Sequence, residues 1–421
     1  MSETALLISN KYPFPCDDGK KTVLAGLLSY LLERYGTENV CYIVIGEKPE
    51  TTLHAPGCRL IWMKPPGRLM QVTNLVGSLL GFNSRSMQES MTYSPRLQHS
   101  LVKLAGELEP TLMVLDTLRI GQYFHDQNRP GCRRILYMDD LFYLRYQRML
   151  KAAEDGIRYD PTGTFAAFLP PAARTLLNIR GIQKLLYRIE MNKIEHREIE
   201  STGFFDLSLL INPNEVQTLQ ERHPPGPVRS IKPLLYQESC KVERSYDGAP
   251  VFLMFGSLRH PVYRASVINF LECCMEKIIR EMPDVRIRVV GGGADDQIVE
   301  LASQYGEHVD IAGFIPDLDS VFATSCALLI PIIAAGGLKI KTITALYYGL
   351  PVIATDHGVD GIPLTEEDFF IRENEIDRFP MHMKRLCDTT YNREISRNAS
   401  RTYQNHYAKN RVYEEYRELF G

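Results

Sequence analysis

The chain has 421 residues, more than one hydrophobic core usually serves, so the length predicts two domains of roughly 200 residues each. The net charge of −3 gives no reason to expect a nucleic-acid partner. The nine cysteines form no C-x-x-C pair and no metal-type spacing, which favours reduced thiols. We also find no signal-peptide pattern and no apolar run of roughly 18 residues, so the sequence indicates a cytoplasmic protein.

The N-terminal pattern predicts a strand, a turn and a helix. Residues 5–10 form a continuous apolar run typical of a buried parallel strand, and a Pro-rich turn follows it. The turn carries Asp18, Gly19 and Lys20 just before an amphipathic helical pattern, and a second strand is predicted over residues 40–45. A glycine after the first strand lets the backbone approach a ligand, so these three residues are candidates for a ligand cleft.

An apolar stretch with glycines covers residues 68–82 and predicts a helix. It has two interpretations: a core helix, or an exposed helix that meets lipid or a lipid-linked acceptor. Core packing is the commoner outcome for such a pattern, and we expect it here.

Aspartates follow the next two predicted strands. The strand after the helix at 98–108 ends in Asp116, with Arg119 beyond it, and the strand at 134–138 is followed by Asp139 and Asp140. Ligands of open α/β sheets bind beyond the carboxyl ends of the strands, so the aspartates are candidates for acceptor binding or base catalysis. They would also serve as N-caps of the following helices. We prefer the N-cap interpretation for Asp116. For Asp139 and Asp140, both the N-cap and the functional interpretation remain open.

A charged helical region and a Pro-rich linker follow. Residues 152–200 predict long helices, and the charge run at their end is typical of a solvated helix face. Residues 222–250 hold several prolines and few apolar runs, as linkers do. We therefore expect a first domain at 1–225 with a helical insertion at about 152–200, a second domain at 226–400, and a C-terminal helix at 401–421.

The second half opens with the strand VFLMFG, which delivers Gly256, Ser257 and Arg259. Backbone N–H groups of the first two, with the guanidinium of Arg259, are suited to a diphosphate. A solvated surface arginine is the alternative for Arg259. The strand VDIAGFI follows later in the chain.

Residues 332–362 combine glycines, lysines and two strands. An apolar strand enters a small-residue turn that ends in Gly336 and Gly337, and a helical pattern with Lys339 and Lys341 comes next. A glycine turn that opens a helix is an anion site, because N–H groups converge there and the helix dipole favours negative charge. The two ammonium groups add point charges for phosphate oxygens. An ordinary βαβ connection with solvated lysines is the alternative.

This stretch resembles the C-terminal half of GT-B glycosyltransferases of the group 1 (GT4-like) kind. Their pattern is G-x-G-x-K-x-K-x-x-E-A-x-x-x-G-x-P-V-x-x-T-x-x-G-x-x-G. The family's glutamate, which usually grips the donor ribose, is Thr344 here, and the acidic position eight residues earlier is Gly336. The residues in register are Gly337, Lys339, Lys341, Ala345, Gly349, Pro351, Val352, Thr355, Gly358 and Gly361.

The resemblance implies an α/β GT-B fold, with two Rossmann-like domains facing each other across a cleft and a C-terminal helix returning to the first domain. It divides the candidate residues into three groups. The candidate catalytic residues are Asp139, Asp140, Lys339 and Lys341. The candidate donor-binding residues are Gly256, Ser257, Arg259, Gly313, Phe314, Ile315, Gly337, Leu338 and Thr344. The candidates on the acceptor side of the cleft are Asp18, Gly19, Lys20, Asp116, Arg119 and His357.

The implied function is retaining transfer of a sugar from a nucleoside-diphosphate donor, a UDP-sugar first, to a glycan or lipid-linked acceptor in surface polysaccharide or glycoconjugate biosynthesis. We expect no metal and no other cofactor, because no Asp-x-Asp motif stands at a strand end in the way metal-dependent transferases use one. Peripheral association with the inner face of a membrane is open. The substitution at Thr344 motivates an alternative, a non-catalytic GT-B-like partner subunit or glycan-binding protein. A sugar-nucleotide epimerase is a weaker third hypothesis.

Overall fold

The computed structural model describes residues 3–48, 57–127, 130–154, 180–240, 242–332, 338–363 and 369–421. They form two compact units. The first takes in the described residues up to Leu150, residues 180–234, and Tyr413–Gly421. The second takes in residues 151–154 and Leu235–Val412. The chain therefore passes between the units inside the Pro-rich segment.

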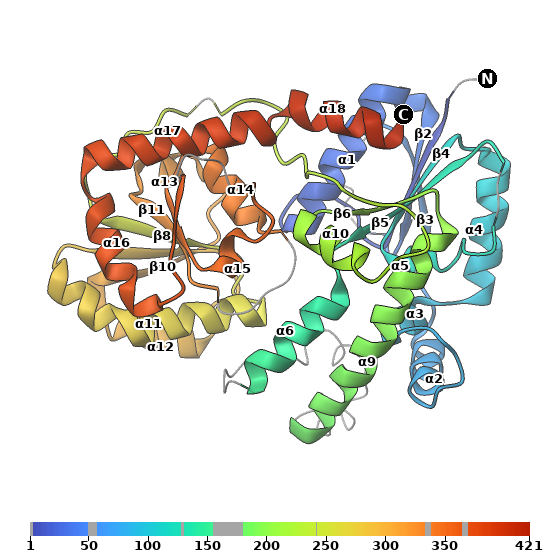
Figure 1. Cartoon of the computed structure of the whole chain (residues 1–421), viewed down its shortest axis with the longest axis horizontal. Coiled ribbons are helices and arrows are strands. Elements are labelled where there is room, and N and C mark those ends of the chain that lie inside the picture. The colour runs from blue at the N-terminus through green and yellow to red at the C-terminus, as the bar shows by residue number, and fades with distance from the viewer. Residues whose placement is uncertain are drawn as a thin grey trace. The chain divides into compact units, whose positions relative to one another are not determined.

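The first unit is built on a seven-stranded, wholly parallel sheet in the order β3-β2-β1-β4-β5-β6-β7 (Figure 1). Its central strands are mostly apolar, and every residue of the first strand is buried, as expected where helices cover both faces of a parallel sheet. The strands are β1 (Ala5–Ser9), β2 (Val40–Ile45), β3 (Arg59–Met63), β4 (Leu112–Asp116), β5 (Arg133–Asp139), β6 (Leu207–Leu210) and β7 (Val228–Ser230).

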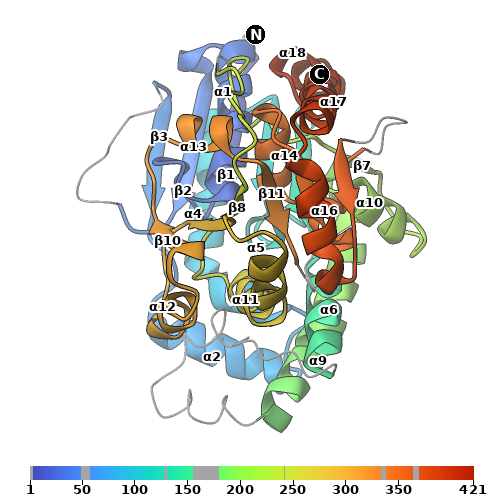
Figure 2. The same cartoon turned by 90° about the vertical axis from the view of Figure 1, so that its left-hand side faces the viewer.

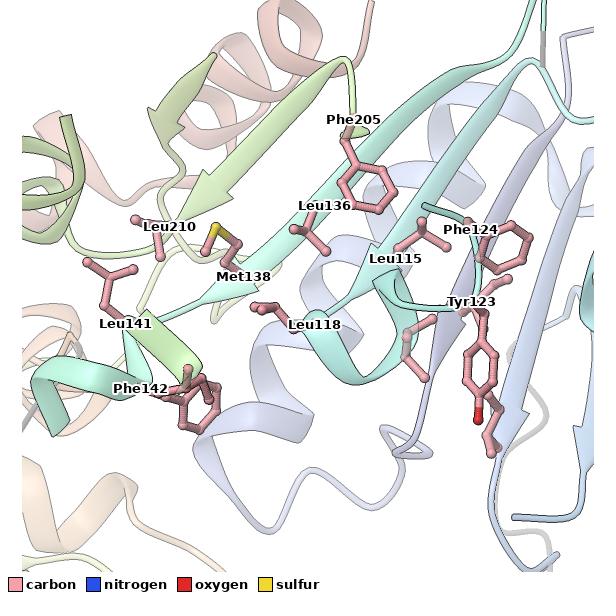
Figure 3. Close-up of a cluster of buried hydrophobic side chains, with 14 of the residues drawn as sticks. Leu115, Leu118, Tyr123, Phe124, Leu136, Met138, Leu141, Phe142, Phe205 and Leu210 are labelled. Atoms are coloured by element: carbon pink, nitrogen blue, oxygen red, sulfur yellow. The ribbon is translucent and has the colours of Figure 1, made fainter. Parts of the chain in front are cut away.

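Helices pack on this sheet through one large apolar core. Part of that core is drawn in Figure 3, where side chains of β4, β5 and β6 meet Leu118, Tyr123, Phe124 and Phe205. The helices of the unit are α1 (Gly19–Tyr35), α2 (Arg68–Leu79), α3 (Met87–Thr92), α4 (Pro95–Leu108), α5 (Leu118–Gly121), α6 (Phe142–Glu154), α9 (Arg180–Ser201) and α10 (Pro213–Gln220).

Helix α2 differs from its predicted role as a core helix. Leu75 and Ser78 are its buried residues, whereas Leu69, Val76 and Leu80 are exposed. The prediction was wrong for most of the helix, because an apolar pattern does not say which face turns inward.

Helix α9 differs in part from its prediction, because three residues of its charge run are buried rather than solvated. Glu190 and Glu198 are fully buried, and Arg197 is nearly so. The side chain of Arg197 pairs with Glu89 at 3.0 Å, and the two glutamates accept hydrogen bonds from backbone N–H groups at the starts of α3 and α6. Figure 1 shows α6 and α9 extending side by side from the sheet.

The second unit has a six-stranded parallel sheet in the order β10-β9-β8-β11-β12-β13, visible edge-on in Figure 2. Two apolar clusters cover its faces, one around Phe252 and Phe270 and the other around Leu328 and Phe322. Its strands are β8 (Val251–Phe255), β9 (Arg286–Val290), β10 (Val309–Gly313), β11 (Ala327–Ile330), β12 (Val352–Ala354) and β13 (Phe370–Arg372). Its helices are α11 (Pro261–Glu281), α12 (Asp296–Ser303), α13 (Asp319–Thr324), α14 (Ile340–Tyr347), α15 (Asp356–Val359), α16 (Phe379–Leu386) and α17 (Thr389–His406).

The C-terminal segment contains two helices rather than the one predicted over 401–421. Helix α17 ends at His406, and α18 (Lys409–Phe420) begins after a short break. The end of α18 packs on the first unit: the rings of Tyr413 and Tyr416 lie 5.0 and 5.1 Å from that of Tyr30 in α1. The expected return of the final helix is therefore present.

Candidate active site

The order of the first sheet reverses direction between β1 and β4, and a charged cluster lies at this point. In an open parallel sheet, ligands bind beyond the carboxyl ends of the strands where the order reverses. Ser9 ends β1, Asp116 ends β4, and Lys20 lies in the first turn of α1, which follows β1. The candidates Lys20, Asp116 and Asp139 come together here.

Lys20 is held between the two carboxylates. Its Nζ lies 2.6 Å from Asp116 Oδ1 and 3.2 Å from Asp139 Oδ2, while the Ser9 hydroxyl donates to Asp116 Oδ2 at 2.5 Å. Burial opposes the lysine's charge, but the two carboxylates outweigh it and raise the pKa of Lys20 above its ordinary value. The lysine therefore neutralises part of a buried acidic site.

Asp139 and Asp140 have separate partners. Asp139 adopts a left-handed backbone with a φ of 76°, which non-glycine residues rarely do, and burial followed by the nearby Asp140 raises its pKa despite Lys20. Asp140 is buried and pairs with Arg145. Among the described residues, its Oδ1 accepts no hydrogen bond. A strained aspartate with a raised pKa beside an unsatisfied carboxylate oxygen is suited to accepting a proton.

The N-cap interpretation of these aspartates is wrong. Asp116 lies within β4, and Thr117, which precedes α5, makes no side-chain cap. The start of α6 is held instead by glutamates distant in sequence: the Leu141 N–H donates to Glu215 Oε2 at 2.7 Å, and that of Phe142 donates to Glu198 Oε1 at 2.6 Å.

The other candidates of the first unit lie around this cluster. Asp18 caps α1 by accepting from the Lys21 N–H at 2.8 Å and also pairs with Lys11, so its role is structural. Gly19 is the exposed first residue of that helix. Arg119 donates from Nε to Thr117 at 3.3 Å and lies over the ring of Phe142, and burial lowers its pKa.

The second sheet reverses its order between β8 and β11, and close backbone packing marks this point. Gly256 ends β8 with a φ of 146°, and its N–H donates to Val290 O at 2.9 Å. Gly291, at the end of β9, has the same φ, and a Cβ there would collide with the carbonyl oxygen of Gly256. Both positions require glycine.

Lys341 reaches this glycine pair from α14. Its Nζ lies 3.2 Å from the centre of the Tyr263 ring, and a Cβ added at Gly256 would lie 2.8 Å from the same ammonium. Within the described part of the chain no carboxylate pairs with it. Burial, together with the neighbouring Lys339, lowers the pKa of Lys341 well below its ordinary value. An anion placed here would stabilise its charged form.

The residues before α14 are described from Leu338 onward. Leu338 and Lys339 are buried, and Lys339 is the residue that precedes the helix, with extended backbone. Gly337 and Gly336, predicted to form the phosphate turn, lie outside the described residues.

Thr344, at the position of the family's glutamate, is buried and hydrogen-bonded. The hydroxyl of Tyr236 donates to Thr344 Oγ1 at 3.4 Å, and the Tyr236 ring stacks on Tyr347 at 3.7 Å. A tyrosine thus lies beside the position where the family has a carboxylate, and the threonine has a protein partner of its own.

The remaining donor candidates follow β8 and β10. Gly313 has a φ of 66° and its carbonyl accepts from the Gly291 N–H at 2.7 Å, which joins the ends of β9 and β10. Phe314 beyond it is 72% exposed, and Ile315 is partly buried. Ser257 and Arg259 are exposed, and Arg259 packs against Gly293. An exposed aromatic ring at a strand end offers a stacking surface.

His357 lies in the short helix α15 of the second unit. The adjacent Gly358 carbonyl accepts from the Thr342 hydroxyl at 2.6 Å, which ties α15 to α14. The glycine is required by packing, because a Cβ would lie 2.9 Å from side-chain atoms of Ala354 and Ile330.

Sequence reasoning missed Ser9, Arg145 and Tyr263. Ser9 could have been found, since it is the last residue of the first strand and thus lies at the ligand edge. Arg145 and Tyr263 lie within helical patterns that carry no signal of their contacts.

Metal ligation and membrane spanning were also searched. Across the described ranges, no group of three or more His, Cys, Asp or Glu side chains is placed to hold a metal ion. In the same residues, no helix combines the length and apolarity needed to cross a bilayer.

Comparison with solved structures identifies the fold. Sucrose-phosphate synthase from Thermosynechococcus elongatus is 16% identical and superposes with a TM-score of 0.64 over 99% of both chains. HepE from Anabaena in complex with UDP-glucose is 13% identical, with a TM-score of 0.61 over 99% of this chain and 98% of that one. A glycosyltransferase from Rickettsia africae is 11% identical, with a TM-score of 0.61 over 100% and 98%. The chain has the GT-B fold of two Rossmann-like domains.

Part of the second unit matches a known family model. Residues 249–389 match the family model described as Glycosyl transferases group 1, and the predicted resemblance is confirmed over that segment. A Klebsiella pneumoniae protein described as an uncharacterized 44.6 kDa protein in the cps region is 21% identical over 243 residues. The match covers 55% of this chain and spans 60% of the length of that relative.

Proposed function

We propose that the protein is a retaining glycosyltransferase that transfers a sugar from a UDP-sugar to a glycan or lipid-linked acceptor. The observation that carries the proposal is the partly buried ammonium of Lys341, which lies over Tyr263 and against Gly256 with no carboxylate partner in the described residues. The family match over residues 249–389 and the UDP-glucose complex of HepE support the donor class.

The donor belongs to the second unit in this proposal. Transfer breaks the bond between the sugar's anomeric carbon and a diphosphate oxygen, so negative charge grows on the leaving diphosphate. Lys341, Lys339 and the N–H groups beyond Gly256 oppose that charge, the kind of preorganised stabilisation that contributes most to catalysis. These groups supply positive charge without a metal ion. The ring of Phe314 stacks on the uracil.

The acceptor belongs to the first unit. Its hydroxyl forms the new glycosidic bond and gives its proton to Asp139, whose raised pKa suits a general base. Asp140 Oδ1 accepts a hydrogen bond from a second acceptor hydroxyl, and Lys20 holds Asp139 in place. The retaining outcome and a role in surface polysaccharide or glycoconjugate biosynthesis rest on the family resemblance.

A second candidate is a non-catalytic GT-B-like partner subunit or glycan-binding protein. The burial of Thr344 and its bond to Tyr236 favour it, because no carboxylate stands at the ribose position. In the transferase proposal, Tyr236 and Thr344 contact the ribose as neutral groups.

A panel of UDP-, GDP- and dTDP-sugars separates the two candidates. The purified protein is incubated with each donor, and nucleoside diphosphate release is followed with and without short glycan acceptors. The transferase proposal predicts release from one donor class, lost in Asp139→Asn, a variant that keeps nucleotide binding. Binding of no nucleotide at millimolar concentration supports the partner subunit instead.

A further inference from the structure

Helix α2 presents an apolar face to the outside of the first unit. Leu69 is 80% exposed, Leu80 is 64% exposed, and Phe82, just past the helix, is 80% exposed. Met70 and Val76 are exposed as well. Leu69, Val76 and Leu80 are spaced seven and four residues apart, so they share one side of the helix. These five side chains form what we call the α2 outer face.

The opposite side of the same helix is fixed to the protein. Asn74 donates through Nδ2 to the carbonyls of Ser90 at 3.0 Å and Tyr93 at 2.9 Å. Ser78, four residues on, donates to Arg85 O at 2.9 Å, and its own carbonyl accepts from Lys193 Nζ of α9 at 2.6 Å. Leu75 of the same side is buried in the core of the first unit. These hydrogen bonds and one buried leucine therefore hold the helix with the α2 outer face exposed.

The segment around α2 carries charge of one sign. Between residues 57 and 88 there are four basic residues, Arg59, Lys64, Arg68 and Arg85, and no aspartate or glutamate, although the whole chain has a net charge of −3. Arg59, Lys64 and Arg68 are exposed and lead into the helix. An apolar face beside a basic segment is the pattern of a helix that lies in a membrane interface.

We propose that the α2 outer face docks the protein on an anionic lipid bilayer, with the helix lying in the plane of the interface. The apolar side chains enter the boundary between headgroups and acyl chains, and the basic residues contact lipid phosphates. This site is independent of sugar transfer and stands whether or not the proposed reaction is correct.

The size of the face favours a bilayer over a second protein. A 12-residue helix is about 18 Å long and 10–12 Å wide, so one side offers roughly 200 Å². A stable protein interface buries about 800 Å² on each partner. A lipid surface needs no such complementary area, because insertion of a few apolar side chains together with charge attraction is sufficient.

Cosedimentation of the full chain with vesicles tests the proposal. We expect binding to vesicles that mix phosphatidylglycerol with phosphatidylcholine, weak binding to phosphatidylcholine alone, and a loss of binding as salt is added. Leu80→Asp should weaken binding to the anionic vesicles by at least about tenfold. The double variant Lys64→Gln, Arg68→Gln should reduce the preference for anionic lipid.

Matched controls exclude a general effect of the substitutions. Val299→Asp places the same charge at a 50% exposed valine of α12, and it should bind vesicles like wild type. Both Asp variants should keep the wild-type unfolding temperature, since neither side chain lies in a core. The proposal is overturned if wild type does not bind anionic vesicles, or if Leu80→Asp binds as tightly. It is equally overturned if the face proves to be a dimer contact, with Leu80→Asp converting a dimer to a monomer in sedimentation.

Discussion

At the scale of single residues, Lys20 is the side chain on which the first half of the site depends. Asp116 is fully buried and Asp139 largely so, and the ammonium lies within 3.2 Å of both carboxylates. Buried ionised groups are tolerated only when they are paired, and removing one partner leaves the others uncompensated. The lysine is therefore required for folding as well as for the site.

Lys20→Met should lower the free energy of unfolding by roughly 3–5 kcal/mol near neutral pH. The loss should shrink in acid, because the raised pKa of Asp139 lets this carboxyl become protonated in the folded protein once its cation is absent. Urea unfolding at neutral and acidic pH measures both effects. Lys21→Met is the matched control: its ammonium pairs with the more exposed Asp17 at 2.7 Å, and its loss should cost no more than about 1 kcal/mol. Equal losses in the two variants would contradict this account.

The residue scale also shows what a sequence pattern can identify at the site. Lys20, Asp116, Asp139 and Gly256 were predicted from their places after strands, because strand ends of a parallel sheet meet at one edge. The contact of Lys341 with Tyr263 was not predictable, since it joins two helices whose spacing in the chain says nothing about their approach.

At the scale of elements, α9 is the helix on which its neighbours depend. Its Glu190 accepts from the N–H groups of Met87 at 2.6 Å and Gln88 at 3.2 Å, and Glu198 accepts from those of Phe142 and Tyr143. Each carboxylate satisfies donors that a helix start leaves without an intrahelical partner. One helix therefore caps two others, α3 and α6.

Glu190 should make stability depend on pH. Burial raises its pKa from 4.5 to about 7, so between these values the folded protein holds a proton that the unfolded chain releases. Stability contributed by this group is full below about pH 4.5 and falls as the pH rises through 7, by roughly 3 kcal/mol in all. The difference in unfolding free energy between wild type and Glu190→Gln, measured from acidic to alkaline pH, should change by this amount.

The exposed Glu107 of α4 provides the control for that measurement. Glu107→Gln should change the unfolding free energy by no more than about 1 kcal/mol, because its exposed carboxyl has only a weak surface partner, Lys103 at 3.8 Å. A difference for Glu190→Gln that does not change with pH would contradict the raised pKa of Glu190.

The elements explain which predictions failed. The central strands were predicted within one or two residues because buried parallel strands are unbroken apolar runs. The charge run of α9 was misread as solvated, since a sequence does not show that helix starts distant in the chain supply the partners of its glutamates. The edge strands β3, β7 and β13 were missed because they are short or partly exposed.

At the scale of the molecule, the two units share the same arrangement of a parallel sheet and a lysine. Each has a wholly parallel sheet whose order reverses once, between β1 and β4 or between β8 and β11, and each places a partly buried lysine at that point. The two lysines differ in their partners. Lys20 is neutralised by carboxylates, whereas Lys341 has none in the described residues. The second unit is therefore the one prepared to receive an anion.

Calorimetric titration of the full chain with UDP tests this central claim most directly. Lys341→Met removes the ammonium from Tyr263 and Gly256, while the control Lys277→Met removes an exposed ammonium of α11 that donates to Asp377 O at 2.9 Å. Wild type and the control should bind UDP alike, because both keep the ammonium beside Gly256. Lys341→Met should bind at least about tenfold more weakly. Equal affinity in all three proteins would contradict the account.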